Sequence, residues 1–220
     1  GWRPDNELTT DPRWAGFETP PTSNANYGWI LNILSKLSID GEAGLILSNG
    51  ALSADGTEKE IRKKLLEMGK VECILILPGK LFYSTDISVT LWILNNNKKA
   101  RTKTKNGNEI HYRDREKEVL FFDLRQMAVP YEKKYVELPP ETRNKVANTY
   151  HVWQQAGYET SYENTPEYCY TAKIEEIRDK DYSLVPSKYI EFKNLDTDVD
   201  FEAEMTKIST ELRPILAERK

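Results

Sequence analysis

The chain has few of the residues that build metal centres and disulfide frameworks. Its 220 residues include two cysteines, Cys73 and Cys169, and two histidines that lie far apart in the sequence. A structural zinc site needs four ligands, usually Cys and His at close spacing, so these counts argue against zinc or any other bound metal. Two cysteines also form no disulfide framework, which makes a reducing, cytoplasmic location the expected one.

Long apolar runs and the common catalytic patterns are missing as well. No apolar run approaches the ~20 residues of a membrane-spanning helix, and no signal peptide is visible. Gly41, Gly44 and Gly50 lack the spacing of a dinucleotide-binding loop, and no Ser/His/Asp, Cys/His or HExxH pattern occurs. The sequence therefore predicts no membrane partner and offers no acid–base pair of its own.

The charge balance is slightly acidic but uneven. With 31 basic and 35 acidic residues the net charge is −4, which argues against a surface that binds nucleic acid throughout. One run nevertheless holds only basic charges: Lys98, Lys99, Arg101, Lys103 and Lys105. This run predicts either a set of DNA-phosphate contacts or a solvated hairpin whose charges keep a sheet edge soluble.

What the sequence does contain is an alternation of helix and strand patterns. Apolar residues at 3.6-residue spacing predict helices over 26–37 and 58–68. Short continuous apolar runs predict buried strands over 43–47, 71–77 and 88–94. Such alternation is typical of an α/β fold with a parallel sheet. Between the last two strands, 79–88 forms a loop with two large aromatic side chains.

Side chains at the ends of these helices predict where they begin and stop. Ser23 or Asn24 can cap the first helix with a side-chain oxygen. Thr57 and Glu60 have the spacing of a capping box at the start of the second helix. Gly69 ends that helix, since glycine readily adopts the left-handed conformation of a helix C-terminus.

The second part of the chain is more mixed. Asn106-Gly107 predicts a hairpin tip with 110–112 and 119–124 as its flanking strands. Pro139-Pro140 opens a helix that ends near Gly157, and a weaker helix pattern covers 171–180. We expect an extended segment over 1–23, an α/β unit over 24–130 with an insertion at about 98–118, and a helical region over 131–220.

The last helix pattern carries an apolar seam at alternating steps of four and three. Its members are Phe201, Met205, Ile208, Leu212 and Ile215. This spacing is that of a coiled-coil seam, although Pro214 would bend or end the helix. The seam predicts either a docking helix or a terminal helix packed on its own domain.

Several segments resemble, in the same order, the modification (M) subunit of type I restriction-modification systems. The segments are NANYGWI (24–30), GLILSNG (44–50), EIRKKL (60–65), VECI (71–74), LPGKLFY (77–83), LWIL (91–94), EVLFFDLR (118–125), TYHVW (149–153) and LVPSKYI (184–190). That family transfers a methyl group from S-adenosylmethionine to adenine N6 in DNA. The resemblance is colinear over roughly 11–190.

The resemblance implies a class I, Rossmann-like methyltransferase sheet, of which this chain is the C-terminal half with a β-hairpin insertion and a helical tail. The family's Gly-rich cofactor loop and its Asn-Pro-Pro-Phe loop do not occur here; the Pro20-Pro21 pair follows Thr19 instead. We therefore expect this chain alone to be inactive and to bind S-adenosylmethionine only weakly. Its implied partners are double-stranded DNA, the specificity (S) and restriction (R) subunits, and the N-terminal half of the M subunit.

The resemblance also implies roles for individual residues. Phe82, with Tyr83 beside it, matches the aromatic position that stacks on the target adenine. Tyr27 and Ile30 match a helix start that lines the cofactor pocket, and Asn49 follows a strand end that faces the substrate pocket. Simpler roles stay open, because Phe82 can fill a space at the sheet edge, and Tyr27 and Ile30 can pack in the core.

Two other functions remain compatible with the sequence. The chain could be an assembly module that docks the specificity subunit through 199–220. It could also belong to another Rossmann-like methyltransferase, one that acts on a small molecule.

Overall fold

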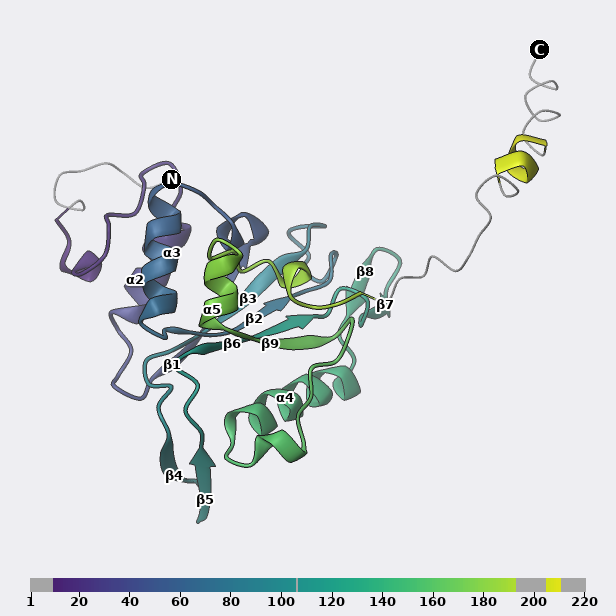
Figure 1. Cartoon of the computed structure of the whole chain (residues 1–220). Helices are drawn as coiled ribbons and strands as arrows, with labels where there is room; N and C mark the ends of the chain where they lie inside the picture. Colours follow the sequence, from purple (N-terminus) through teal and green to yellow (C-terminus); the bar gives the residue numbers. More distant parts are fainter. Residues whose placement is uncertain (1–9, 106, 193–204, 211–220) are drawn as a thin grey trace.

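The chain folds around one mixed sheet with helices on both faces (Figure 1). The computed structural model describes residues 10–105, 107–192 and 205–210, without the side chain of Lys105. Five strands form the sheet in the order β1-β3-β2-β6-β9. Their bounds are Glu42–Ser48 for β1, Val71–Ile76 for β2, Val89–Asn95 for β3, Glu118–Asp123 for β6 and Cys169–Lys173 for β9. Helices α2 (Asn26–Leu34), α3 (Thr57–Glu67) and α5 (Ile174–Asp179) cover one face, and α4 (Pro140–Gln154) covers part of the other.

The prediction of a parallel sheet was wrong. Only β2 and β6 pair in parallel, whereas β3 is antiparallel to both β1 and β2, and β9 is antiparallel to β6. The reason is the short loop between β2 and β3, which returns the chain beside the strand it has just left. β1, β2 and β6 still run in the same direction, so their carboxyl ends meet at one edge of the sheet.

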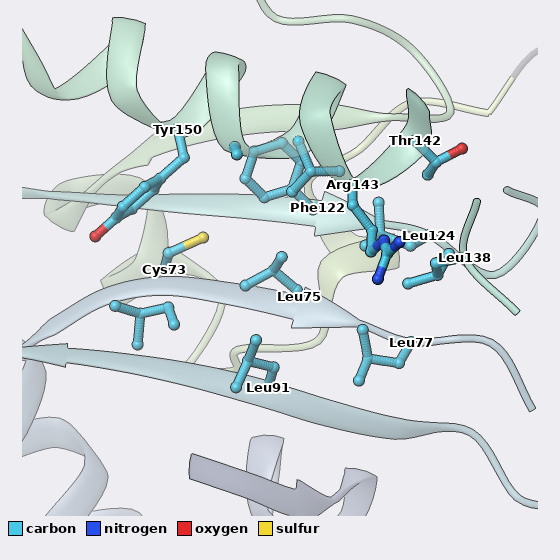
Figure 2. A pocket seen from close by; sticks show the side chains of 13 residues that line it. Cys73, Leu75, Leu77, Leu91, Phe122, Leu124, Leu138, Thr142, Arg143 and Tyr150 are labelled. Atoms are coloured by element: carbon cyan, nitrogen blue, oxygen red, sulfur yellow. The ribbon is translucent and has the colours of Figure 1, made fainter. Parts of the chain in front are cut away.

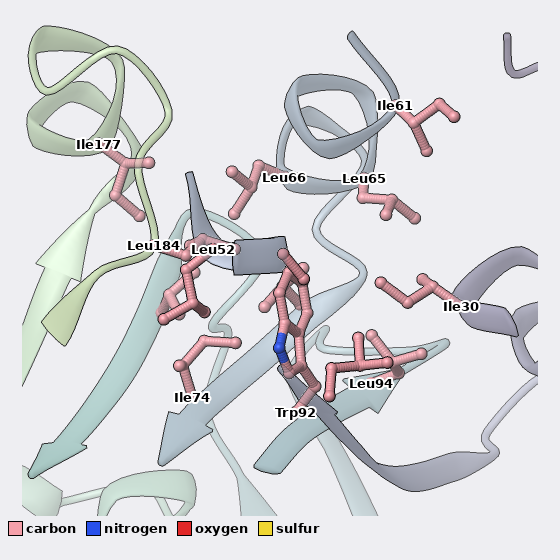
Figure 3. Close-up of a cluster of buried hydrophobic side chains, with 14 of the residues drawn as sticks. Ile30, Leu52, Ile61, Leu65, Leu66, Ile74, Trp92, Leu94, Ile177 and Leu184 are labelled. Carbon is pink, nitrogen blue, oxygen red and sulfur yellow. The ribbon is translucent and has the colours of Figure 1, made fainter. Parts of the chain in front are cut away.

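The first hydrophobic core lies between the sheet and helices α2, α3 and α5. Trp92 stands at its centre, fully buried, and donates a hydrogen bond from Nε1 to the Thr90 hydroxyl at 3.2 Å (Figure 3). The ring of Tyr27 meets Trp92 edge-on, with 6.2 Å between ring centroids. Full burial of one large apolar side chain stabilises a fold by about 1.5–3 kcal/mol, so this face holds the sheet firmly.

The second core lies under α4 and is smaller. Trp153 of α4 packs over Phe122 of β6 and Cys73 of β2, and all three are fully buried. The cover stops before the end of the sheet, because Ile46 on β1 keeps 48% of its surface exposed. The α4 face is therefore only partly closed in the described residues.

The helix boundaries match one of the three predictions fully. Gly69 adopts a left-handed φ of 65° where α3 ends. The N-cap position of α2 is Ala25, which makes no side-chain capping bond, although Asn24 Oδ1 accepts from the backbone of Asn26 at 3.0 Å. The Thr57 capping box was wrong, since Thr57 is already inside α3 and its side chain makes no capping bond. Gly56 precedes the helix instead, and its carbonyl accepts from Glu60 N at 3.2 Å.

The hairpin around Asn106-Gly107 has a different partner from the predicted one. β5 (Asn108–Tyr112) pairs with β4 (Arg101–Lys105), and the predicted partner, β6, lies in the central sheet. The run Val-Leu-Phe-Phe in β6 is buried, as an interior strand requires. The Arg-Thr-Lys-Thr-Lys run of β4 is polar enough to pair in solvent.

The region after 130 is not purely helical. β7 (Val129–Tyr131) and β8 (Tyr135–Glu137) form a second small hairpin, and part of the predicted 171–180 helix is β9, which joins the central sheet. Short 3-10 turns complete the chain at Pro12–Trp14, Asn49–Leu52, Tyr158–Thr160 and Pro186–Lys188.

The terminal seam lies mostly outside the described residues. Residues 205–210 are helical, with Met205 and Ile208 exposed, whereas Phe201, Leu212 and Ile215 are not described. Among the described helices, none has the length and apolar character needed to cross a membrane.

Candidate functional site

The carboxyl ends of β1, β2 and β6 form one edge of the sheet, and the most prominent feature there is the loop from β2 to β3. We call residues 77–88 the aromatic loop. Leu77 N donates to Val89 O at 2.8 Å, and Lys80 N donates to Asp86 O at 3.2 Å, so the two sides of the loop are bonded to each other. A tight turn closes its tip, where Thr85 N donates to Phe82 O at 3.3 Å. The loop is thus a short ladder with an aromatic tip.

Two backbone positions make this narrow loop possible. A Cβ at Gly79 would lie 2.8 Å from the Asp86 carbonyl oxygen, so only glycine fits there without a shift of the backbone. Lys80 follows in the left-handed region with φ 60°, which is unfavourable for a residue with a side chain. Strain of this kind persists where the surrounding bonds impose it, and it is common at functional sites.

The structure places Phe82 and Tyr83 in the turn at this tip. Phe82 is half-buried and packs against the edge of the α4 core, so its ring is not deep in the interior. Tyr83 is 72% exposed. Both rings lie beyond the carboxyl end of β2, where open α/β folds bind their ligands. Their predicted stacking role remains a prediction, and their position is compatible with it.

The β7–β8 hairpin stands against the aromatic loop, and sequence reasoning missed it. Val136 N donates to Lys80 O at 3.1 Å, and the rings of Tyr83 and Tyr135 meet edge-on at 4.7 Å between centroids. Lys134 and Asp86 add an exposed ion pair at 3.9 Å. The available signal was two short runs of β-forming residues around a polar turn, Val-Pro-Tyr and Tyr-Val-Glu.

A second residue that sequence reasoning missed is Arg125, at the carboxyl end of β6. The buried Asp123 carboxylate accepts from its Nε at 3.0 and 3.1 Å and from its Nη2 at 2.6 Å. These bonds raise the pKa of Arg125 and fix the guanidinium, which stays partly exposed at this edge. The Asp-Leu-Arg sequence directly after an apolar strand was the signal.

Asn49 also lies at this edge, directly after β1. It is half-buried, and its Oδ1 has no hydrogen-bond partner in the part of the chain that the structure describes. This oxygen is enclosed by the protein and not open to a ligand in this structure, and the pocket role of Asn49 remains a prediction.

Tyr27 and Ile30 have a different environment. Both are fully buried, and Tyr27 Oη donates to the Ala51 carbonyl at 2.6 Å. Burial raises the pKa of Tyr27 to about 12. These side chains have no surface left for a cofactor ring, so the described residues here fit a packed core and do not fit a cofactor pocket.

A cavity of about 250 Å³ opens between α4 and the sheet (Figure 2). Its walls are Leu75, Leu91 and other apolar side chains of β2, β3 and β6, and Tyr150 and Arg143 of α4 border it. Burial raises the pKa of Tyr150 strongly, so this hydroxyl stays protonated.

The members of the basic run do not share one exposed surface. Lys98 is only 2% exposed, and its Nζ donates to the carbonyls of Val71 at 2.8 Å and Glu118. Burial lowers its pKa to about 8. The phosphate role of Lys98 is therefore wrong. Arg101 also turns inward, to the Asn97 carbonyl and the ring of Tyr112.

The remaining members of the run are less constrained. Lys99 is exposed and Lys103 is half-buried on the hairpin, and the side chain of Lys105 lies outside the described residues. A phosphate role for these three is not tested by their surroundings and remains a prediction.

A buried ion pair explains why this region is packed so tightly. Arg115 Nε donates to Glu72 Oε1 at 3.0 Å, and both side chains are fully buried. Gln154 of α4 donates to the same oxygen at 3.0 Å, so the network joins β2, the base of the hairpin and α4. The β4–β5 hairpin leaves the sheet at its amino end, opposite the aromatic loop (Figure 1).

Comparisons with known proteins agree on one family. The family model for N-6 DNA methylase matches residues 2–198. The methylase subunit of the type I restriction enzyme HindI from Haemophilus influenzae is 34% identical over 95% of this chain and 43% of its own length. The MjaIX methylase subunit of Methanocaldococcus jannaschii is 31% identical over 91% of this chain and 34% of its own.

Solved structures show the same likeness. The type I methyltransferase subunit of Streptococcus thermophilus superposes with a TM-score of 0.70 and 26% identity, over 87% of this chain and 35% of that one. The M protein of the type I restriction enzyme EcoKI shares the fold, with a TM-score of 0.55 and 18% identity over 90% of this chain and 45% of that one. The chain therefore spans less than half the length of these relatives.

Proposed function

This chain belongs to the N-6 DNA methylase family, and we propose that it supplies the target-base end of a type I modification subunit. The whole protein would transfer a methyl group from S-adenosylmethionine to adenine N6 in DNA. Because the chain spans 43% of its Haemophilus relative, this activity is proposed for the whole protein.

The observation that carries the proposal is the position of Phe82. A base-modifying enzyme takes its target out of the helix and holds it by stacking. Phe82 lies on a hydrogen-bonded loop at the carboxyl edge of the sheet, partly open to solvent. A ring held on such a rigid support can receive a base with little loss of conformational freedom. We assign stacking on the adenine to Phe82.

The methyl donor is assigned to the whole protein for a structural reason. S-adenosylmethionine supplies the methyl group, but Tyr27 and Ile30 are packed inside the first core. The contribution of this chain is then to bind the base and orient its amino group. Asn49 lies at the same edge of the sheet, directly after β1, and we keep its assignment to the substrate pocket.

We assign the open side of the sheet to the rest of the modification subunit. In the described residues β1 is the last strand on its side, and Ile46 on it is exposed. Leu91 and Ile93 of the neighbouring strand are only partly covered by α4. An apolar sheet face with an open edge favours cover by further structure. Double-stranded DNA and the specificity and restriction subunits are the further proposed partners.

The test is methylation by the full-length modification subunit assembled with its specificity subunit. Phe82→Ala removes the ring and should lower kcat/KM by at least about 5-fold, because stacking on one base is worth about 1–3 kcal/mol. Phe82→Trp keeps an aromatic face and should retain most of the activity. Ile39→Ala, an exposed position at the opposite edge, is the matched control.

Full activity of Phe82→Ala would remove the stacking role. A subunit that methylates no adenine in any duplex, while binding a small-molecule acceptor, would remove the proposed function itself.

A further inference from the structure

Three tyrosines form a continuous surface beside Phe82. Tyr131 and Tyr135 face each other across the β7–β8 hairpin, and the Tyr135 ring meets the Tyr83 ring edge-on. Tyr131 and Glu132 are close enough to Tyr83 to raise its pKa. We call Tyr83, Tyr131 and Tyr135 the tyrosine patch.

Packing alone does not account for this patch. Tyr83 is 72% exposed and Tyr131 is 43% exposed, so a large part of each residue contacts water. The hairpin below them has two strands of three residues each, which is marginal without outside support. Tyr135 is the half-buried member, and together with the Val136–Lys80 backbone bond it joins the hairpin to the aromatic loop.

We propose that the tyrosine patch is a second nucleic-acid-contacting surface, in which Tyr83 and Tyr131 stack on the bases left unpaired when the target adenine leaves the helix. Tyr135 is a positioning residue that holds Tyr83 at the correct angle. The inference rests on the proposed function, because it needs an extruded base.

The position of the patch indicates nucleic acid as its partner. Tyr83 directly follows Phe82, so any base held by Phe82 brings its neighbours to the patch. Exposed aromatic rings bind unpaired bases irrespective of sequence, since every base has a π face. Because the tyrosine patch adjoins Phe82 in the chain through Tyr83, nucleic acid is the partner that its position favours.

The charges around the patch indicate how it binds. Lys80, Lys133 and Lys134 are balanced nearby by Asp86 and Glu132, and one of these lysines is already paired with Asp86. Little positive charge is left to neutralise phosphates. The patch therefore acts by stacking, and its contribution to affinity does not depend on salt.

The test is equilibrium binding of the full-length subunit, assembled with its specificity subunit, to two duplexes. One duplex is fully paired, and in the other the target adenine is replaced by an abasic position, so that the thymine opposite it has no partner. Tyr83→Ala and Tyr131→Ala should each weaken binding to the second duplex about 30-fold, the middle of the range for stacking on one base. The slope of log affinity against log salt should not change.

Variants of Tyr135 separate positioning from folding. Tyr135→Phe keeps the ring and should bind like the wild type, whereas Tyr135→Ala should lose as much affinity as Tyr83→Ala. Ile39→Ala controls for the loss of an exposed apolar side chain, and melting curves of all variants show whether the fold survives.

Two results would overturn the inference. The first is that Tyr83→Ala and Tyr131→Ala both bind with wild-type affinity while Phe82→Ala loses methylation. This result would refute the binding role of the tyrosine patch and leave the proposed function intact. An equal loss on both duplexes with a reduced salt slope would show a phosphate contact in place of stacking. If Phe82→Ala is fully active as well, the proposed function fails first.

Discussion

The two ends of the central sheet each carry a small hairpin, and they differ in where their side chains point. At the amino end, cationic residues turn inward, and Lys98 and Arg115 are fully enclosed at the base of the β4–β5 hairpin. At the carboxyl end, aromatic residues turn outward, and Tyr83 and Tyr131 are exposed beside Phe82. A run of basic residues in sequence is thus no proof of a basic surface.

The energetic cost of each arrangement explains its role. Burying a charge is expensive unless it is paired and hydrogen-bonded. Here Lys98 donates to two carbonyls and Arg115 is paired with Glu72, although Arg115 Nη2 and Glu72 Oε2 have no partner among the described residues. Such a network fixes the fold. An exposed aromatic ring gains no stabilisation from burial, so a cluster of such rings indicates a surface that binds a partner or ligand. Changes at the amino end should therefore alter stability, and changes at the carboxyl end should alter DNA binding and methylation.

The largest expected effect is loss of the buried ion pair. Arg115→Ala leaves Glu72 charged and unpaired in the interior, which should lower the free energy of unfolding by about 3–5 kcal/mol. Urea denaturation measures it. Lys134→Ala breaks the exposed Lys134–Asp86 ion pair at the other end and should cost about 1 kcal/mol or less. Similar losses for both variants would contradict the contrast between the two ends.

A smaller effect is expected from Gly79→Ala in the aromatic loop. The new Cβ would lie 2.8 Å from the Asp86 carbonyl, so the loop must shift, at a cost of about 1–3 kcal/mol. Because the loop carries Phe82, methylation should fall as well. Gly50→Ala, which has open space around its Cβ, is the control. An unchanged methylation rate for Gly79→Ala would show that the loop geometry is unimportant.

Lys98 should make stability depend on pH. Its pKa is lowered from 10.5 to about 8 by burial, so between these pH values the unfolded chain holds a proton that the folded chain has released. The contribution of Lys98 to the free energy of unfolding therefore becomes more favourable to the folded state as pH increases from about 8 to 10.5, by roughly 1–3 kcal/mol. The difference between wild type and Lys98→Met over this range isolates the effect. If the two proteins showed the same dependence of unfolding free energy on pH, Lys98 would not be buried.

The smallest effect concerns an ion pair that joins α3 to α5. Hydrogen bonds from Arg178 lower the pKa of Glu67 from 4.5 to about 2. This contribution is complete above pH 4.5 and is lost as pH falls toward 2. Both side chains are partly exposed, so Glu67→Gln should cost only about 0.2–1 kcal/mol at pH 7. Chemical denaturation at pH 7 and pH 3 measures the change, and a larger cost at pH 3 would contradict the assignment.

The sequence predicted the elements better than their pairing. The positions of β1, β2, β3, α3 and α4 follow from apolar periodicity, which is a local property. The family resemblance is confirmed, and so is the methyltransferase fold class. The antiparallel pairing of β3 was missed, because pairing depends on the tight loop at Gly79 and on contacts between distant segments.

The same limit applies to the candidate site. The sequence located Phe82 and Tyr83 on a loop after β2, as the structure shows. It could not show that Lys98 would be enclosed, since the carbonyls of Val71 and Glu118 come from distant strands. Nor could it bring Tyr135 to Tyr83, which are separated by two strands of the central sheet and the β4–β5 hairpin in the chain.

The central claim is that the aromatic end of the sheet, and not the basic hairpin, meets the target base. Photo-crosslinking tests it directly: the full-length subunit, assembled with its specificity subunit, is irradiated on a duplex that carries iodouracil in place of the target adenine. The crosslink, located by mass spectrometry of peptides, should fall on Phe82 or Tyr83. A crosslink within the β4–β5 hairpin would contradict the account.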